Sequence, residues 1–192
     1  MQMLDLSYVA NTSSIDDLAG DFKNFTDQGP DNDLRALKPG ILTLPEVEFT
    51  LLDPKQNGGR NIVMTNSYFC WFYPQKKITL PVSSMRMRTL FLLHTSAWMP
   101  GKGALIGILN VRYKDETEDN FEVIGENDLG DWLYPRDFPN GRMAWRSLEA
   151  ENFNRGIFYS AYPIQDKEVE SISFLKGKSG SWIVLAATGL DT

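Results

Sequence analysis

The sequence has a single cysteine and a single histidine among its 192 residues. Cys70, which lies between two aromatic residues, can form no disulfide within the chain, and we expect it to be a small buried hydrophobe. A Ser-His-Asp or Cys-His catalytic site needs an imidazole as its base, and only His94 could supply one. His94 ends an apolar run, a position typical of a structural histidine. One histidine and one cysteine are also too few for the usual zinc sites.

Long apolar runs are missing as well. Apolar runs such as 90–93 and 104–109 fall far short of the ~20 residues that a membrane-spanning helix needs, so the sequence predicts a soluble domain. No glycine-rich nucleotide-binding motif and no G-x-S-x-G nucleophile motif occurs. The first residues lack the basic and apolar regions of a signal peptide, which predicts either a cytoplasmic protein or an excised piece of a longer chain.

Positive charge is nearly absent from the beginning of the chain. Residues 1–34 hold seven aspartates and one lysine, a balance of −6, whereas the remaining residues hold 18 acids and 18 bases. The net charge of −6 therefore comes from one segment, and no basic block is present that would release counterions from a nucleic acid. We expect no nucleic-acid partner and no membrane partner.

Hydrophobic periodicity predicts strands along most of the chain after residue 45. Val47, Phe49 and Leu51 alternate with polar residues, which is the pattern of a half-buried strand. Similar segments, enriched in β-branched and aromatic residues, are separated by turns such as Asn57-Gly58-Gly59 and Asn140-Gly141. The predicted strands are 47–51, 61–65, 78–82, 90–95, 104–113, 121–124, 155–162, 169–174 and 181–188.

No segment places apolar residues at helical spacing over three turns, so helix is expected to be minor. About nine strands with polar turns predict an all-β fold, an antiparallel sandwich or barrel, in one domain that spans residues 1–192. Residues 1–45 are expected to form an acidic, loop-rich segment packed on that domain. A short helical turn is expected at 15–18.

The acidic segment offers the hard oxygen ligands that Ca²⁺ prefers. Six of its aspartates are interleaved with asparagine and glycine, although their spacing does not match an EF-hand. The alternative is that they form turns and caps, which aspartate favours in any case. The sequence predicts a structural calcium site made from some of Asp16, Asp17, Asp21, Asp27, Asp31 and Asp33.

The chain has five tryptophans. Trp71 and Trp182 lie within strand-like runs, and we expect them in the core. Trp98, Trp132 and Trp145 lie in loops, where a flat ring can stack on the C–H face of a sugar while charged neighbours bind its hydroxyls. The alternative is that each loop ring closes the end of the sandwich. The polar candidates beside these rings are Asp131, Tyr134, Arg136 and Arg146.

Several of these segments, in chain order, resemble accessory β-sandwich domains of bacterial secreted polysaccharide-degrading enzymes. The segments are Val9-Ala10-Asn11, 16–21, 25–35, 90–98, 111–117 and Gly130-Asp131-Trp132. The chain departs from that family where Asp115-Glu116 replaces an Asp-Gly turn. It departs again where 161–164 replaces an aromatic residue followed by Asn-Pro, which puts in doubt any ligand contact made there.

The resemblance implies a galactose-binding-like jelly roll that acts as a non-catalytic carbohydrate-binding module. It implies an extracellular protein in which this domain targets an appended glycoside-degrading enzyme to polysaccharide, with no catalytic residues of its own. Two alternatives stay open. One is a small glycoside hydrolase or lyase that uses a carboxylate pair or Tyr/Arg chemistry. The other is a purely structural accessory domain.

Overall fold

The computed structural model describes residues 1–67, 69–147 and 154–191, and within these ranges the fold is all-β. The one helix in these ranges is the three-residue 3-10 helix η1 (Pro54–Gln56), capped by Asp53. No helix of the described chain is long and apolar enough to cross a membrane. The strands are β1 (Gln2–Leu4), β2 (Gly40–Thr43), β3 (Glu48–Leu51), β4 (Val63–Met64), β5 (Lys77–Ala97), β6 (Leu105–Tyr113), β7 (Glu118–Ile124), β8 (Arg142–Ser147), β9 (Arg155–Lys176) and β10 (Ser181–Leu190).

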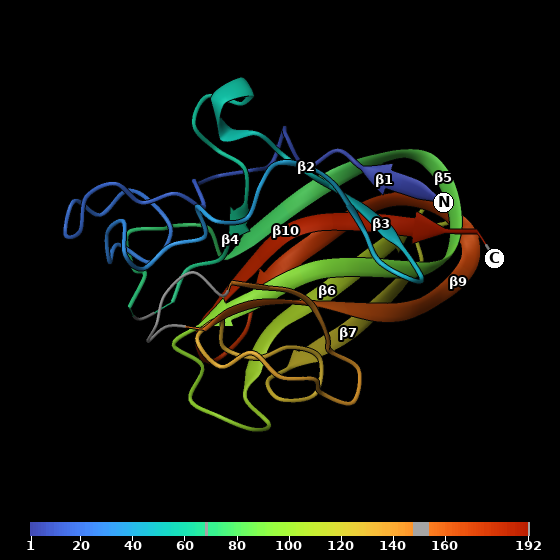
Figure 1. Ribbon diagram of the computed structural model, residues 1–192. Coiled ribbons are helices and arrows are strands. Elements are labelled where there is room, and N and C mark those ends of the chain that lie inside the picture. Colours follow the sequence, from blue (N-terminus) through green and yellow to red (C-terminus); the bar gives the residue numbers. More distant parts are fainter. Residues whose placement is uncertain (68, 148–153, 192) are drawn as a thin grey trace.

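The strands form one large antiparallel sheet and one hairpin. The order in the sheet is β1-β10-β5-β9-β6-β7, with β4 also paired to β10 and β8 also paired to β9. β2 and β3 pair with each other in a separate two-stranded sheet. Both termini lie at the same end of the molecule (Figure 1).

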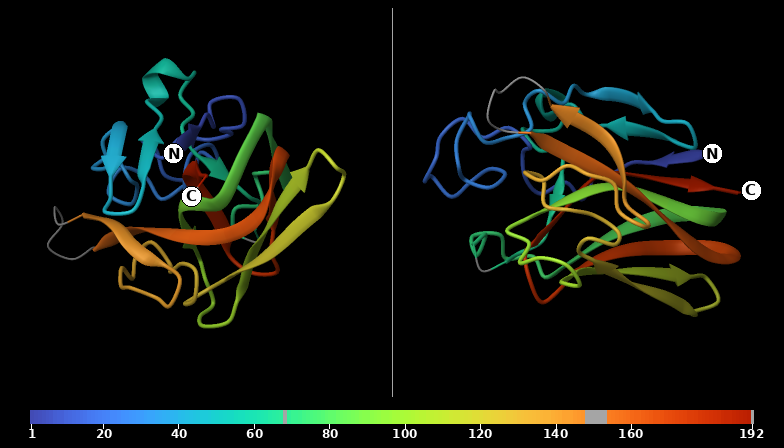
Figure 2. Two further views of the ribbon diagram at one scale, coloured as in Figure 1. Left: turned by 90° about the vertical axis from the view of Figure 1, so that its right-hand side faces the viewer. Right: turned by 60° about the horizontal axis from the view of Figure 1, so that its bottom comes forward.

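Two long, bent strands turn this single sheet into a sandwich. The first part of β5 pairs with the last part of β9, from Lys77↔Leu175 onward, and the second part pairs with the beginning of β9, up to His94↔Phe158. The register shifts between Pro81 and Met85, where the pair bends and the two halves fold over each other (Figures 1 and 2). Segments that the sequence presents as four short strands are therefore halves of two long ones.

The main core lies between the two layers. It joins Leu90, Leu92 and Trp182 of one layer to Ile172 and Phe174 of the other. The Phe174 and Trp182 rings meet edge to face, with their centroids 5.6 Å apart. Burial of these alternating residues is what selects the β register, because a shift of one residue would turn each of them to the opposite face. The antiparallel β-sandwich is confirmed, and the jelly-roll connectivity stays a prediction.

A second core covers the other face of the β10–β5–β9 layer. Phe91, Leu93 and Ile183 point to this face, and the N-terminal segment covers them with residues that include Phe25 and Leu34. Because this layer is apolar on both faces, the sequences of its strands are continuous apolar runs and do not alternate between apolar and polar residues. Residues 1–45 thus pack on the sandwich as loops and short strands.

The structure corrects several local expectations. Residues 15–18 form bends and no helical turn. Strands β1, β2 and β8 were not predicted from the sequence. Trp71, expected in the core, is 64% exposed, because it lies in the loop before β5 and outside any strand. Trp182 and Cys70 are fully buried, as expected.

Candidate functional site at the loop end of the sandwich

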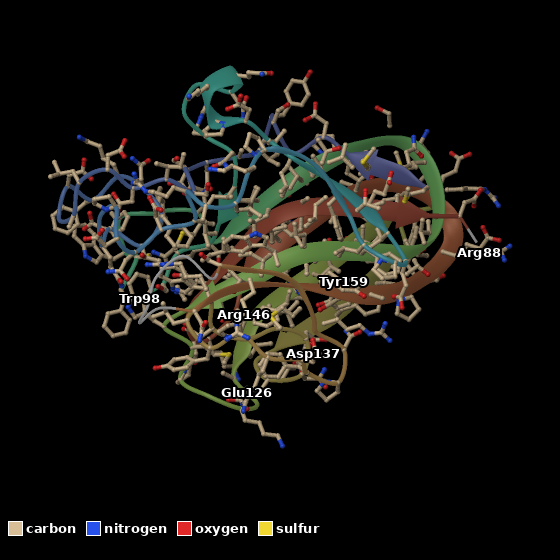
Figure 3. The ribbon with its side chains drawn as sticks, viewed as in Figure 1. Arg88, Trp98, Glu126, Asp137, Arg146 and Tyr159 are labelled. Carbon is tan, nitrogen blue, oxygen red and sulfur yellow. The ribbon has the colours of Figure 1, made fainter. Side chains whose placement is uncertain are left out.

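Loops gather at the end of the sandwich away from both termini. They are 98–104 between β5 and β6, 125–141 between β7 and β8, 177–180 between β9 and β10, and the loop that precedes β5 (Figure 1). Figure 3 places Trp98 and Glu126 at this end and Arg88 at the opposite end. Sequence-distant aromatic and charged side chains therefore share one surface.

Asp131 ties two of these loops together. The Ser96 amide donates to the Gly130 carbonyl (3.1 Å), and the Trp132 amide donates to the Ser96 carbonyl (2.9 Å). The Asp131 carboxylate accepts hydrogen bonds from the Met99 and Leu133 amides, each at 3.1 Å. Burial raises the pKa of Asp131 above its ordinary value, and these backbone donors oppose the rise. Asp131 thus holds the loops in place with both of its oxygens.

One depression lies beside Tyr134 and has a volume of about 550 Å³. The Tyr134 ring is 73% exposed. Arg136 forms an ion pair with Glu126 (2.5 Å), and its guanidinium lies 5.2 Å from the centre of the Phe138 ring. The arginine is therefore held between a carboxylate and a ring. The lining residues are Met99, Gly101, Glu126, Asp131, Leu133, Tyr134, Pro135, Arg136, Phe138 and Asn154. We call this the Tyr134 depression.

A second depression, of about 310 Å³, lies beside Trp98. The Trp98 and Phe69 rings, which both line it, stack on each other with centroids 5.5 Å apart and planes 23° apart. Phe69 is 57% exposed, and Trp98 is half-buried. The lining residues are Ser67, Phe69, Trp98, Pro100, Lys176, Lys178, Ser179 and Gly180. We call this the Trp98 depression.

The turn 98–101 separates the two depressions. Its residues face them alternately: Trp98 and Pro100 line one, and Met99 and Gly101 line the other. Trp98 has a φ of +54°, a left-handed conformation that costs a non-glycine residue on the order of 1–3 kcal/mol. The Asp131 bond to the Met99 amide next to it fixes this turn. The two depressions thus share a wall that presents a tryptophan.

The structure does not bring every predicted site residue to this surface. Trp132 is 1% exposed, and its ring meets Phe25 edge to face at 4.9 Å. The prediction that Trp132 offers a ring to a ligand is therefore wrong, because the N-terminal segment covers it. Trp145 is half-buried against the second core, and Arg146 is exposed on β8; neither lines the two depressions.

Sequence reasoning missed Phe69 and the two lysines beside Trp98. The run of aromatic residues that contains Phe69 and Trp71 lies between Asn66 and Pro74, and such turn-forming neighbours could have indicated rings displayed on a loop. No sequence signal indicated that Lys176 would lie beside Trp98, because only the pairing of distant strands brings the two together.

Backbone amides already use most of the acidic-segment carboxylates. Asp16 accepts from the Gly29 amide (2.8 Å), and Asp27 accepts from the Phe22 amide (3.0 Å). The backbone carbonyl of Asp31 accepts a hydrogen bond from Arg155. These contacts are typical of turn-forming aspartates.

The other aspartates pair with bases. Asp33 forms an ion pair with Arg35 (2.7 Å), which also reaches Asp17 (3.1 Å), and Asp21 pairs with Lys23 (3.1 Å). In the described ranges, no group of three or more His, Cys, Asp or Glu side chains could hold a metal. The six aspartates therefore do not converge into a calcium site here, and calcium binding stays a prediction.

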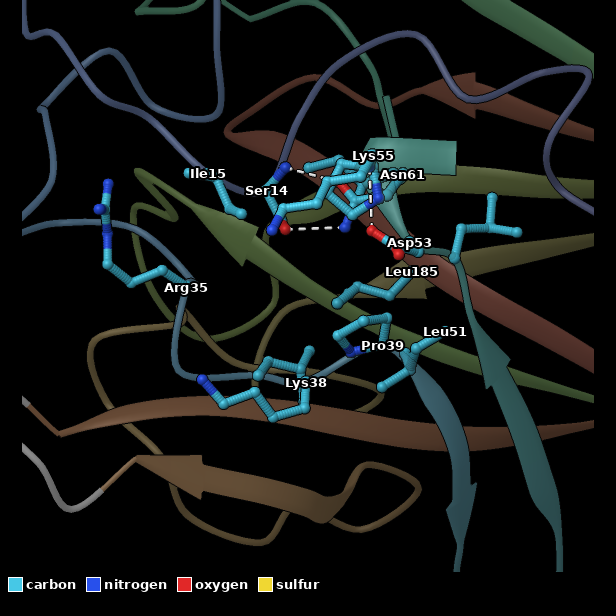
Figure 4. A pocket seen from close by; sticks show the side chains of 14 residues that line it. Ser14, Ile15, Arg35, Lys38, Pro39, Leu51, Asp53, Lys55, Asn61 and Leu185 are labelled. Carbon is cyan, nitrogen blue, oxygen red and sulfur yellow. Dashed lines mark hydrogen bonds between the residues drawn. The ribbon is translucent and has the colours of Figure 1, made fainter. Parts of the chain in front are cut away.

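A third depression, of about 250 Å³, lies between the N-terminal segment and the β3–β4 connection (Figure 4). Several of its polar groups already have partners within the protein. The Ser14 amide donates to the Asn61 side chain (2.8 Å), and the Asn61 amide returns a bond to the Ser14 hydroxyl (2.9 Å). The Asp53 carboxylate accepts from the Lys55 amide (2.9 Å). We therefore interpret this crevice as the junction between packed segments of the chain.

His94 lies away from the loop surface, in the main core. Trp182 Nε1 donates to His94 Nδ1 (3.1 Å), and His94 Nε2 lies 2.9 Å from Ser160 Oγ. Burial lowers the pKa of His94 to about 3, so the imidazole is neutral. The expected structural role of this histidine agrees with these contacts.

No known family model matches the sequence, and no curated protein matches it either.

Proposed function

We propose that this protein is a non-catalytic carbohydrate-binding module that holds an appended polysaccharide-degrading enzyme on its substrate. The observation that supports it best is the display of aromatic rings beside polar groups in two adjoining open depressions. Tyr134 is exposed in one, and the stacked Phe69 and Trp98 rings line the other. A sugar ring offers C–H faces to such surfaces and hydroxyls to their polar rims.

The energetics favour this ligand class. Large aromatic side chains left in water on a folded protein usually mark a binding surface when they gather in one place. Ring contacts of this kind contribute ~0.5–1.5 kcal/mol beyond the area that they bury. The paired Arg136 and Glu126 offer charged donors and acceptors at a fixed position, which suits the hydroxyls of a sugar.

The carboxylates argue for binding over hydrolysis. A glycoside hydrolase needs two carboxyl groups that flank the bond to be cut, at ~5–5.5 Å or ~6.5–9.5 Å from each other. Among the described residues that line the Tyr134 depression, the carboxylates are Glu126 and Asp131. The first is neutralised by Arg136, and the second accepts two backbone amides. Both carboxylates are thus already engaged by other groups of the protein.

A lyase is the second candidate, because Tyr134 and Arg136 line the same depression. In such an elimination, the arginine would neutralise the uronate carboxylate and the tyrosine would move the C5 proton to the departing oxygen, while the C4–O bond breaks and a C4=C5 double bond forms. The products of that reaction absorb in the ultraviolet, so incubation with uronate polymers separates it from binding. We expect no such products and no release of reducing sugar.

A glycan array followed by calorimetry tests the proposal. Trp98→Ala and Tyr134→Ala should each weaken binding of an array hit roughly five- to tenfold, about 1 kcal/mol or slightly more, without unfolding the protein. Trp71→Ala is the control, since this aromatic residue is exposed and lines neither depression. No binding to any glycan, or an equal loss in the control, would overturn the proposal.

The attachment to an enzyme and the extracellular location belong to the same proposal. They rest on the resemblance to accessory domains of secreted polysaccharide-degrading enzymes. If the glycan array shows no binding although the protein is stably folded, the alternative of a purely structural accessory domain would be favoured.

A further inference from the structure

Two lysines line the Trp98 depression together with the aromatic rings, and no acidic residue lines it among the described residues. Lys176, at the end of β9, is half-buried, and its ammonium donates to the Asn66 side-chain carbonyl (2.9 Å). Lys178 is exposed in the following turn. Asn66 is neutral, so it positions the Lys176 ammonium without cancelling its charge.

Further lysines surround this pair. The Lys176 amide donates to the carbonyl of Lys76 (2.8 Å), directly before β5, so the two residues lie opposite each other across the strand pair. Opposite residues of antiparallel strands point to the same side, where like charges destabilise the sheet. Lys102 is exposed in the turn that follows Pro100. The depression therefore lies in a local concentration of positive charge on a chain whose net charge is −6.

At the other end of the same strands, basic side chains have acidic partners. There, Arg88 pairs with Asp166 (2.8 Å), Arg112 pairs with Glu170 (2.9 Å), and Lys167 pairs with an acid as well. Across the part of the chain that the structure describes, no ion pair involves Lys76, Lys102, Lys176 or Lys178. An external anion would supply the missing counter-charge.

We propose that the Trp98 depression binds an anionic sugar residue, one that carries a uronate carboxylate or a sulfate ester. The sugar ring packs on the Trp98 and Phe69 rings, and its negative group lies between Lys176 and Lys178. Ser179, which also lines the depression, supplies a hydroxyl for the hydroxyls of the sugar. This inference rests on the proposed carbohydrate-binding function and names the class of glycan.

The chemistry requires both features together. An aromatic face favours a ring with an apolar side, and ammonium groups favour a negatively charged group. A neutral sugar therefore gains only the aromatic contact, and an inorganic anion gains only the contact with the lysines. Because the lysines lie at the surface, salt screens their part of the interaction, with a Debye length of ~8 Å at physiological ionic strength. Affinity for an acidic glycan should therefore fall as salt is added, and affinity for a neutral one should not.

Calorimetry with three oligosaccharides of equal length tests this. They are a hexuronate oligomer, its carboxyl-reduced neutral form, and a sulfated oligomer. The native protein should bind at least one acidic form five-fold or more tighter than the neutral form at low salt. The acidic oligomer that binds more tightly identifies the anionic group as carboxylate or sulfate. Equal affinity for all three oligomers would overturn the inference.

Lysine variants locate the effect. Lys176→Gln combined with Lys178→Gln should remove the preference for acid and leave neutral binding unchanged, whereas Trp98→Ala should weaken both. The matched control is Lys38→Gln combined with Lys55→Gln, a pair of exposed lysines outside this depression. A loss of preference in the control pair as large as in the test pair would mean unspecific attraction and would overturn the inference.

The outcomes separate this inference from the proposed function. Neutral and acidic oligomers bound equally, with no effect of the lysine variants, would overturn the anionic site and leave the carbohydrate-binding function standing. No binding of any sugar by the native protein would overturn both. Melting midpoints of the lysine variants should match that of the native protein, because the substituted lysines make no ion pair within the described structure.

Discussion

Replacing His94 with glutamine should flatten the dependence of the unfolding free energy on pH between about pH 7 and about pH 5. The chain has one histidine, so one imidazole dominates this range. The Trp182 indole can only donate, which makes His94 Nδ1 an acceptor and puts the proton on Nε2, toward Ser160 Oγ. Ser160 in turn donates to the carbonyl of Asp128. A second proton on the ring would have no partner.

The magnitude follows from the two pKa values. In the unfolded chain the imidazole takes up its proton near its ordinary pKa of 6.5, whereas burial lowers the pKa in the folded protein to about 3. Below pH 6.5, only the unfolded state binds this proton, so stability falls as pH falls until about pH 3. The loss approaches roughly 1.4 kcal/mol per pH unit and totals about 4 to 5 kcal/mol over the window.

Urea denaturation of the native protein and of His94→Gln, at matched pH values, measures this effect. Glutamine keeps an acceptor for Trp182 and a donor for Ser160 but does not titrate, so the difference between the two pH profiles isolates the imidazole. Identical profiles would refute the reasoning. So would a folded-state imidazole resonance that titrates near pH 6.5, because it would place the ring in contact with water.

Three further results are expected. Trp132→Ala should lower the unfolding free energy by ~3–5 kcal/mol and Tyr134→Ala by less than ~0.5 kcal/mol in urea denaturation; equal effects would contradict the assignment of Trp132 to the core. Gly107→Ala should cost ~1–3 kcal/mol, because its Cβ would lie 2.2 Å from the Trp182 ring, and the cost should shrink when that ring is also made smaller. A melting scan with and without a chelator tests the predicted calcium site: calcium at 100-fold over its dissociation constant should add about 2.7 kcal/mol to the unfolding free energy, and an unchanged midpoint would assign the aspartates of residues 1–34 to turns and caps.

The all-β class and most strand positions follow from the sequence alone. Strand β6 was predicted to within one residue, because apolar and polar side chains alternate along it and Gly101 and Gly103 mark its beginning. Such signals are local: they depend on neighbours a few residues away. The burial of Trp182 and Cys70 was predictable for the same reason, since both lie within or beside apolar runs.

The loop surface depends on contacts that no local pattern contains. Trp71 was expected in the core and Trp132 on a ligand surface, yet Trp71 is exposed and Trp132 is buried, because Phe25 from the distant N-terminal segment packs on Trp132. Local sequence therefore did not distinguish the buried tryptophan from the exposed one.

Most of the strands, the turns and the acidic character of the first 34 residues were predictable, because each depends on residue type and short spacing. That β5 and β9 each run through both layers was not predictable from local patterns, because the bend occurs where the pairing of these two distant strands shifts register. That same pairing, together with the loops it positions, brings Lys176 beside Trp98. Long-range pairing is fixed by the packing of the whole core, and no single segment encodes it.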